Sequence, residues 1–383
     1  MPPRVPVPER PAPLVLVTTP AQGQSFGTHA AIAADGQRLL AADLSRRLGR
    51  LGAAVAPLPP EAASGPGPFH WGRWFTAAAR EALRGARGRI DAIGYAGGGS
   101  LALLADDALD DLLSPIDGEV VANNRFSADA FVVAGDLDGA LRALEDCDAD
   151  NAAPRSLEDA GFASRDLGRA AWARFDVDTT VDLALLRLAT RLPETRALDE
   201  STRGFLEMAR LPGGAALEVP HLARIGEVIR DRAAELVVAG RVPSGTWQAL
   251  ETETACRVRC LVEERGMRSA RTPARPPRSV LAALMSRSSP SELVAELAAL
   301  GDAVILDTRV LMASVAGSSD AAAWPPEEER FASDFGQHAS ITTPWLRELT
   351  EAATRAAVPF LFGGHALVSD GLRLIVAAAW QGR

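Results

Sequence analysis

The chain has few cysteines, no long apolar run and no excess of positive charge, and each of these absences excludes a class of protein. Three cysteines in 383 residues cannot form the disulfide framework of a small secreted domain, which favours a reducing compartment. No run approaches the roughly 18 apolar residues of a membrane-spanning helix, and the proline-rich N-terminus does not resemble an apolar signal segment. The formal net charge of −9 argues against a nucleic-acid partner, because affinity for phosphate backbones comes mainly from clustered Lys and Arg. We therefore expect a cytoplasmic protein with neither a membrane nor a nucleic acid as its partner.

The apolar sequence that is present is enough for several domains. A hydrophobic content of 47% suits a globular protein, and a chain of this length exceeds one average core. Residues 14–192 alternate short apolar strands, among them 90–95, 119–122 and 130–133, with helical patterns. This alternation predicts an α/β domain with a mostly parallel sheet and helices on both faces. The other expected segments are a disordered arm at 1–13, a helical region at 193–268, a linker at 269–278 and a small C-terminal α/β unit at 279–383.

The C-terminal half carries several local signals. Helices are expected over 221–240 and 244–266, and another helix is expected to begin at the capping box Ser289–Glu292, which has proline at the first helical position. Polar residues of this half are candidates for a second site, and His365 follows two glycines at the end of an expected strand. They are Glu263, Glu264, Asp307, Arg309, Asp334, His338 and His365. For a lone histidine in such a loop, ordinary hydrogen bonding is the alternative.

Two carboxylates lie close together in the segment Phe175–Leu183. If its first residues form a strand, Asp176 and Asp178 point to the same face, because side chains alternate along a strand. Neighbouring carboxylates repel each other unless a cation lies between them, and Mg²⁺ is typically held by one or two carboxylates together with substrate phosphates. The alternative is structural: Asp178 or Thr179 caps the following helix, with Asp182 favoured in its first turn.

Two glycine-containing loops follow expected strands. Ligands of parallel α/β sheets gather where strands end and helices begin, because free amide groups and helix N-termini attract anions there. The first loop contains Gly23 and Gly27, and the second is Gly97-Gly98-Gly99-Ser100. Neither has the spacing of a known dinucleotide or triphosphate loop, so each predicts phosphate contact with an ordinary turn as the alternative.

A third loop, between two expected strands, is polar. Amide, guanidinium, hydroxyl and carboxylate groups in such a cluster can contact the base, sugar or acceptor of a nucleotide reaction, although Asn and Asp also favour tight turns. The candidate substrate-binding residues are Asn123, Asn124, Arg125, Ser127 and Asp129.

In their order along the chain, these segments resemble the nucleotidyltransferase fold of the molybdenum-cofactor guanylyl- and cytidylyltransferases and of the phospholactate guanylyltransferases, which is similar to glycosyltransferase A domains. Residues 99–104 and the helix expected after them resemble the family's Asp-x-Pro-Leu-Leu motif, and residues 120–133 resemble its substrate-contacting stretch. Phe175–Leu183 resembles the signature Asp-Val-Asp-Thr-Pro-x-Asp-Leu, with Thr180 where proline is usual. The resemblance covers residues 14–190, about half of the chain.

The resemblance implies an enzyme of cofactor biosynthesis that transfers an NMP unit from an NTP to a small phosphorylated metabolite. It implies Mg²⁺ as the cofactor, with Asp106, Asp176 and Asp178 as ligands. The two glycine-containing loops would contact the nucleotide phosphates, and the polar loop would contact the acceptor.

The sequence also departs from the family pattern. Ser100 or Leu101 stands where the family has a metal-binding aspartate, and the N-terminal loop lacks the family's arginine, with Gln37 and Arg38 in the region of its lysine. Two alternatives therefore stay open. One is a catalytically inactive protein that binds a nucleotide or cofactor, and the other is a glycosyltransferase that uses a nucleotide-sugar on the same fold.

Overall fold

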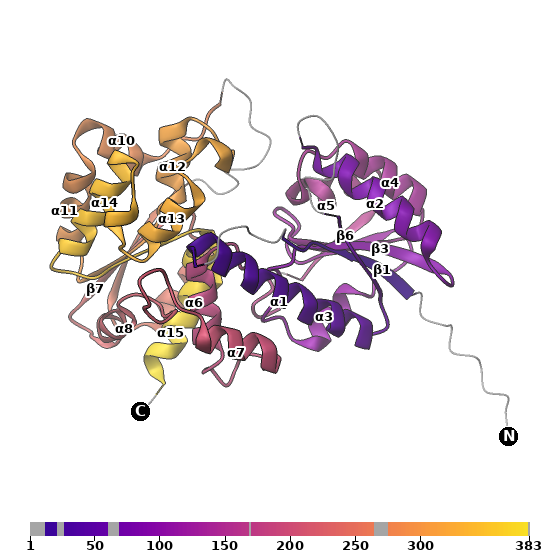
Figure 1. Cartoon of the computed structure of the whole chain (residues 1–383), viewed down its shortest axis with the longest axis horizontal. Coiled ribbons are helices and arrows are strands. Elements are labelled where there is room, and N and C mark those ends of the chain that lie inside the picture. Colours follow the sequence, from indigo (N-terminus) through magenta and orange to yellow (C-terminus); the bar gives the residue numbers. More distant parts are fainter. Residues whose placement is uncertain (1–11, 21–26, 60–68, 168–169, 264–274, 382–383) are drawn as a thin grey trace. The chain divides into compact units, whose positions relative to one another are not determined.

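The chain forms two compact units in a computed structural model that describes residues 12–20, 27–59, 69–167, 170–263 and 275–381. The first unit comprises residues 1–21 and 40–173, and the second comprises residues 22–39 and 174–383 (Figure 1). The division falls inside helix α1 (His29–Arg50), whose first residues belong to the second unit. The expected boundary at residue 192 therefore differs from the observed one, and most of the expected arm and linker lies outside the described residues.

The first unit contains a six-stranded sheet of order β2-β1-β3-β5-β4-β6. Its strands are β1 (Ala12–Val17), β2 (Ala54–Pro57), β3 (Ile90–Ala96), β4 (Glu119–Ala122), β5 (Ala130–Ala134) and β6 (Ala163–Asp166). The sheet is mixed: three of its five strand pairs are parallel, in line with the expected mostly parallel sheet, but β5 runs antiparallel to both β3 and β4. The connection between β4 and β5 is too short for a crossover, so the chain must turn back on itself.

Helices cover both faces of this sheet, as expected. They are α1, α2 (Trp71–Gly85), α3 (Asp106–Leu112), α4 (Leu137–Glu145) and α5 (Ala153–Asp159), with a short 3₁₀ turn η2 (Asp150–Ala152) before α5. Alternation along β1 divides the core: Leu14 and Leu16 pack with residues of α2, α4 and α5, whereas Val15 and Val17 pack with residues of α1 and α3.

The second unit contains a four-stranded, fully parallel sheet of order β10-β9-β7-β8. Its strands are β7 (Glu235–Gly240), β8 (Arg257–Val262), β9 (Ala303–Asp307) and β10 (Phe360–Gly363). The expected helices over 221–240 and 244–266 are therefore wrong in their second halves, because β7 and β8 end them. A short buried run such as Leu236-Val237-Val238 fits a strand or a buried helix equally well by periodicity. The region 193–268 is thus not helical throughout, and its strands join those of residues 279–383 in one sheet.

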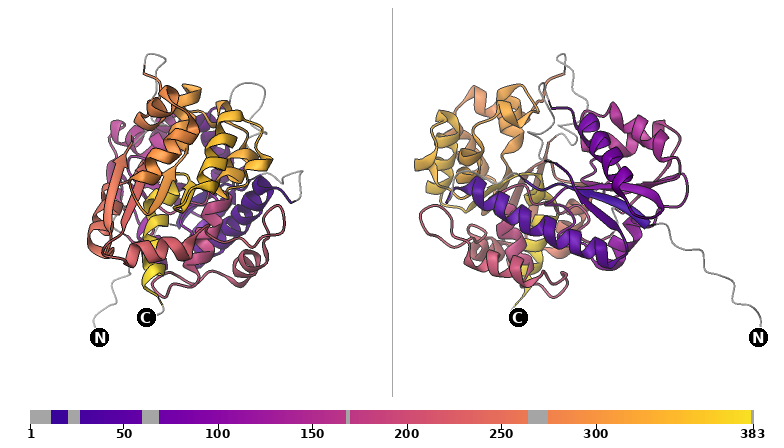
Figure 2. Two further views of the ribbon diagram at one scale, coloured as in Figure 1. Left: turned by 90° about the vertical axis from the view of Figure 1, so that its left-hand side faces the viewer. Right: turned by 45° about the vertical axis from the view of Figure 1, so that its right-hand side comes forward.

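Helices also flank the second sheet (Figures 1 and 2). They are α6 (Thr180–Ala189), α7 (Glu200–Met208), α8 (Leu222–Arg230), α9 (Ser244–Glu253), α10 (Val280–Arg287), α11 (Pro290–Ala299), α12 (Arg309–Ala316), α13 (Glu327–Asp334), α14 (Pro344–Arg355) and α15 (Leu372–Trp380), with the short turns η3 (Ala321–Ala323), η4 (His338–Ser340) and η5 (Leu367–Gly371). Val237, Val304 and Phe362 pack with residues of α10, α11 and α14, while α15 packs against α6 and α8. The expected helix start is confirmed: Ser289 is the N-cap residue of α11, and its hydroxyl accepts a hydrogen bond from the Glu292 amide. The Glu292 carboxylate is bonded to the Ser289 hydroxyl, so the structure shows one of the two bonds of a capping box. None of the helices in the described ranges is long and apolar enough to cross a membrane.

Candidate functional site

The carboxylate segment before α6 is a helix cap and not a strand. Residues 175–178 have no strand partner, and Thr179 is the N-cap residue of α6. One carboxylate oxygen of Asp182, Oδ2, accepts hydrogen bonds from the amides of Asp178 and Thr179 at 3.1 and 2.9 Å and from the Thr179 hydroxyl at 2.8 Å. The shared strand face of Asp176 and Asp178 is therefore corrected, because capping of α6 fixes this backbone instead.

The three predicted Mg²⁺ ligands are divided between the two units, with one in the first and two in the second. Asp106 is the first residue of α3 in the first unit, where its Oδ1 accepts a hydrogen bond from Arg47 Nε at 2.8 Å. Asp176 and Asp178 belong to the second unit, and the Asp176 carboxylate accepts a hydrogen bond from the amide of Val177. The described part of the chain contains no group of three or more His, Cys, Asp or Glu side chains that could hold a metal ion.

Asp182 is an ionisable group whose environment the sequence did not reveal. It is fully buried, and burial together with the charge of Asp178 raises its pKa from 3.8 to about 7. Its second oxygen, Oδ1, has no hydrogen-bond partner among the described residues. The sequence predicts this residue in the first turn of a helix, but it does not show the burial that, together with Asp178, raises the pKa.

Packing and hydrogen bonds fix the backbone of the loop that joins β3 to α3, residues 97–105. Its three glycines do not adopt the positive φ angles that only glycine tolerates easily. None of Gly97, Gly98 and Gly99 has a positive φ, whereas Leu101 has a φ of 59°, which is strained for a side chain of this size. Gly98 is required for space, because a Cβ there would lie 2.5 Å from the Thr18 carbonyl oxygen. Its amide also donates to the Thr18 hydroxyl at 2.7 Å, which ties this loop to the end of β1.

Arg47 of α1 binds the second half of the same loop through hydrogen bonds. Its guanidinium, which is 1% exposed, donates to the carbonyl oxygens of Leu101 and Leu104 and to Asp106. The amide N–H groups of Gly99 and Leu101 donate to no acceptor in the described chain, although both residues are buried. Buried amides are nearly always paired, so this loop presents two unused donors at the carboxyl end of β3.

Ser100 cannot replace the metal-binding aspartate of the resembling family. It is 2% exposed, and its hydroxyl donates to the Gly97 carbonyl oxygen at 2.8 Å. The predicted loop residue Gly23 lies outside the described residues. Gly27 has a φ of 79°, and a Cβ added to it would meet no atom of the described residues within 4 Å. The phosphate contacts predicted for these two glycines stay predictions.

The polar loop between β4 and β5 uses most of its polar groups internally. Asn123 accepts from the amides of Asp129 and Ala130, and it donates to the Asp129 carboxylate and the Ala173 carbonyl oxygen. Asn124 accepts from the Phe126 amide. This bonding explains the tight turn, and contact with a substrate stays a prediction.

The remaining two predicted residues of that loop are bonded to other elements. Arg125 forms an ion pair with Glu158 of α5, with Nη2 and Oε2 2.8 Å apart, and this hydrogen bond lowers the pKa of Glu158. The Ser127 hydroxyl donates to the side-chain oxygen of Asn151 at 2.8 Å. These contacts bind the loop to η2, which contains Asn151, and to α5, which contains Glu158.

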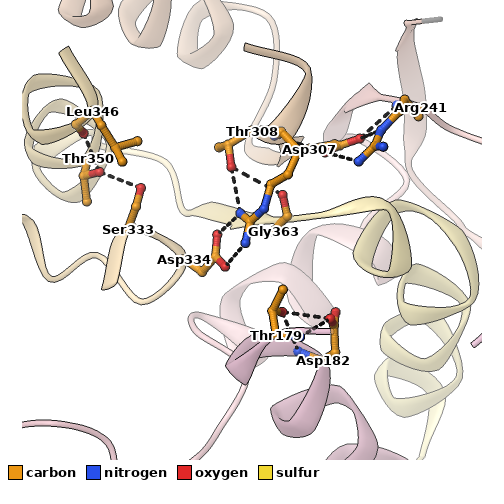
Figure 3. A network of polar contacts seen from close by, with 11 residues as sticks. Thr179, Asp182, Arg241, Asp307, Thr308, Ser333, Asp334, Leu346, Thr350 and Gly363 are labelled. Carbon is orange, nitrogen blue, oxygen red and sulfur yellow. Dashed lines mark hydrogen bonds and ion pairs between the residues drawn. The ribbon is translucent and has the colours of Figure 1, made fainter. Parts of the chain in front are cut away.

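The second unit holds a buried polar network at the carboxyl ends of its strands, which Figure 3 shows. Arg241, which follows β7, donates from Nε and Nη2 to both carboxylate oxygens of Asp307, the last residue of β9, at 2.6 and 3.1 Å. Arg309 donates from Nη2 to Asp334 Oδ2 at 2.7 Å and from Nη1 to the Thr308 hydroxyl at 2.9 Å. Asp307 Oδ1 also accepts a hydrogen bond from the Arg309 amide at 3.2 Å, while the Arg309 guanidinium is bonded to Asp334 and not to Asp307.

The other candidates of the second set are dispersed. Glu263 accepts from the Ser279 hydroxyl at the start of α10, His338 begins η4, and Glu264 lies outside the described residues. Arg241, the central cation of the network, was missed. Its signal was a Gly-Arg pair after an apolar run, but that run was interpreted as helix.

Comparison with known proteins adds no family to these observations. No protein-family model matches the chain, and no curated protein matches it. The likeness to nucleotidyltransferases therefore rests on the sequence motifs.

Proposed function

We propose that the protein is a nucleotidyltransferase-like enzyme whose first unit binds the phosphates of an NTP at the loop of residues 97–105. The observation that carries this proposal is the pair of unused amide donors at Gly99 and Leu101. Phosphate oxygens are acceptors that backbone amides without a partner commonly bind at strand and turn ends. Strain at Leu101 supports the same reading, because residues held in left-handed conformation cluster at ligand sites.

Backbone donors carry particular weight here because the chain contains no lysine. A triphosphate then has to be neutralised by amide groups, arginines and a divalent cation. Asp106 fits one ligand position of Mg²⁺, since only its Oδ1 is bonded to Arg47. Mg²⁺ usually keeps one or two carboxylates and takes its other oxygens from phosphates and water, so the nucleotide would complete the coordination. Mg²⁺ would neutralise charge on the transferring phosphoryl group.

The proposed reaction joins the NMP unit to a phosphorylated metabolite. An oxygen of the acceptor's phosphate attacks the α-phosphorus of the NTP, and the bond to the β-phosphate breaks with release of pyrophosphate. Phosphoryl transfer of this kind depends mainly on positioning and charge neutralisation, which a rigid loop and a bound cation provide.

Nucleotide binding is tested by a matched pair of glycine variants. Gly98→Ala places a Cβ 2.5 Å from the Thr18 carbonyl oxygen, whereas Gly97→Ala places one no closer than 3.5 Å to its neighbours. Calorimetric titration with ATP, GTP and CTP, each with and without Mg²⁺, should show binding that Gly97→Ala preserves and Gly98→Ala weakens about tenfold or more. Absence of any nucleotide binding by the unaltered protein would refute the proposal.

The metal is tested in the same titration. Asp106→Asn should abolish the gain in affinity that Mg²⁺ gives and leave metal-free binding unchanged. Asp176→Asn and Asp178→Asn test the second-unit carboxylates separately, and an unchanged Mg²⁺ effect in both would remove them from the set of ligands.

A catalytically inactive nucleotide-binding protein is the second candidate function. The observation that favours it is Ser100, whose buried hydroxyl is bonded to Gly97 where the resembling family has an aspartate. Release of pyrophosphate from a bound NTP in the presence of phosphorylated metabolites supports the transferase. Binding without release supports the inactive protein, and preferential binding of UDP- or GDP-sugars supports a glycosyltransferase.

A further inference from the structure

The second sheet has a topological switch point between β7 and β9. The chain passes from β7 to β8 on one side, and then crosses to β9 and β10 on the other side, as the order β10-β9-β7-β8 requires. Connections that leave the carboxyl ends of β7 and β9 therefore run in opposite directions. In open parallel α/β sheets, ligands bind outside the carboxyl ends of the strands at such a point.

Ionisable side chains lie at this point, at or just after the ends of three strands. Arg241 follows β7, Asp307 ends β9, and His365 follows β10 after Gly363 and Gly364. Burial opposes ionisation of Asp307, yet the charges of Arg241, His365 and Arg309 hold its pKa below the ordinary value. These ionisable residues therefore lie at the position in the sheet where ligands of such folds bind.

A glycine at the end of β7 allows close approach to the end of β9. Gly240 has a φ of 130°, and a Cβ on it would lie 2.3 Å from the Cβ of Asp307. Only glycine can occupy this position, and it allows the Arg241 guanidinium to reach Asp307. A purely structural ion pair is the alternative, but a buried pair of this kind gives little net stability compared with apolar packing.

The arrangement favours an anionic ligand. The guanidinium of Arg241 is paired with Asp307 and that of Arg309 with Asp334, and His365 acts electrostatically on the same Asp307 carboxyl. Arg241 is 9% exposed, and its Nη1 donates to no other described group, while Nε and Nη2 are engaged with Asp307.

Free backbone donors lie close to Arg241 in the sequence. Ser244 and Gly245 begin α9, are exposed, and their amides have no acceptor among the described residues. The N-cap residue of α9 is Pro243, which supplies no side-chain cap. A helix start of this kind adds to the attraction for an anion that the buried guanidinium already provides.

We propose that the second unit has an oxyanion site of its own, in which Arg241, His365 and the first amides of α9 bind the phosphate group of a small molecule. Asp307 is a positioning residue that orients Arg241 through its two hydrogen bonds. This site is independent of the nucleotide loop of the first unit and does not rest on the function proposed for that loop.

The test uses inorganic phosphate and pyrophosphate as probes of the full-length protein in the Gly98→Ala background, which weakens binding at the first unit. Binding is followed by ³¹P line broadening and by calorimetry. His365→Asn should weaken phosphate binding roughly tenfold, the effect of losing one charge-assisted hydrogen bond. The double variant Arg241→Gln/Asp307→Asn should abolish it, and it avoids leaving a buried charge unpaired.

Arg257→Gln is the matched control, because Arg257 is an exposed arginine of β8 that pairs with Glu235 in the same sheet. It should leave phosphate binding unchanged, and circular dichroism should show that each variant is folded. Failure of the Gly98→Ala protein to bind either probe overturns the proposal. Phosphate binding by His365→Asn and by the folded double variant that is as strong as binding by the Gly98→Ala protein also overturns it. Loss of binding in Arg257→Gln as well would indicate nonspecific attraction to surface arginines and would also overturn it.

Discussion

Replacement of Asp182 by asparagine should remove a defined part of the pH dependence of stability. In the unfolded chain this carboxyl ionises near pH 3.8, but in the folded chain it ionises only near pH 7. Between these values unfolding releases a proton, so stability falls as pH rises and stops falling above the folded pKa. Asparagine has nearly the same shape and can accept the three hydrogen bonds that Oδ2 receives, but it does not titrate.

The magnitude follows from the two pKa values. At about 1.4 kcal/mol per pKa unit, ionised Asp182 costs the folded state about 4 kcal/mol at high pH, relative to a group whose pKa does not change. About half of this develops between roughly pH 5.5 and pH 8.5, because the unfolded group is already ionised at the lower value. The unaltered protein should therefore lose about 2 kcal/mol relative to Asp182→Asn over this interval.

Urea unfolding of both proteins at several pH values measures this difference. Subtraction of the two curves is necessary because burial also raises the pKa values of Asp334 and Asp370, and their contributions have the same sign. Asp178→Asn is an informative second variant, since loss of that neighbouring charge should lower the pKa of Asp182 and move the fall in stability to lower pH.

Parallel pH profiles for the unaltered protein and Asp182→Asn would refute this reasoning. They would mean that Asp182 is ionised over the whole interval in the folded chain, as it is in the unfolded chain. The unpartnered Oδ1 would then need a hydrogen-bond donor or cation that stabilises the carboxylate.

Three further outcomes test the described contacts. Thr179→Ala should lower the free energy of unfolding by about 1 kcal/mol through loss of the α6 cap, and Thr179→Ser should not; equal loss in both would contradict the capping role. Arg47→Met should destabilise the first unit by about 3 kcal/mol, measured by chemical unfolding, because buried loop carbonyls lose their donor, and a loss below about 0.5 kcal/mol would count against it. Arg241→Gln should destabilise the protein by about 3 kcal/mol or more, and the added Asp307→Asn should restore much of this; no restoration would contradict an unpaired charge as the cause.

Local patterns predicted the strands well where the apolar run was bounded by turns. The segments expected as strands at 90–95, 119–122 and 130–133 coincide with β3, β4 and β5 to within a residue. The antiparallel course of β5 was missed, although the short connection between the runs at 119–122 and 130–133 leaves no room for a crossover. The helix cap at Ser289 was predictable because its three signals act over a few residues only.

Prediction failed where burial or pairing decides the outcome. β8 is a half-exposed edge strand in which Arg257-Val258-Arg259-Cys260 alternates charged and apolar residues. This short strand pattern was overlooked because the whole segment was interpreted as a helix. Asp176 and Asp178 fit a strand pattern, but the hydrogen bonds of Asp182 favour a cap in the same place. The Arg241–Asp307 pair joins residues from two strands far apart in the sequence, which no local pattern indicates.

The location of the unit boundary inside α1 has a consequence for synthesis of the chain. The first turn of α1 is completed by Glu328, whose carboxylate accepts hydrogen bonds from the amides of His29 and Ala30, across a sequence separation of 299 residues for the first pair. Thr180 and Gln37 add contacts between the same helix region and the α6 segment. A growing chain therefore lacks the Glu328 contacts at the beginning of α1 until almost all of the protein has been translated. N-terminal fragments that end near residue 192 should keep the local Thr28 cap but leave the amides of His29 and Ala30 without Glu328, which favours fraying and proteolysis of this helix end.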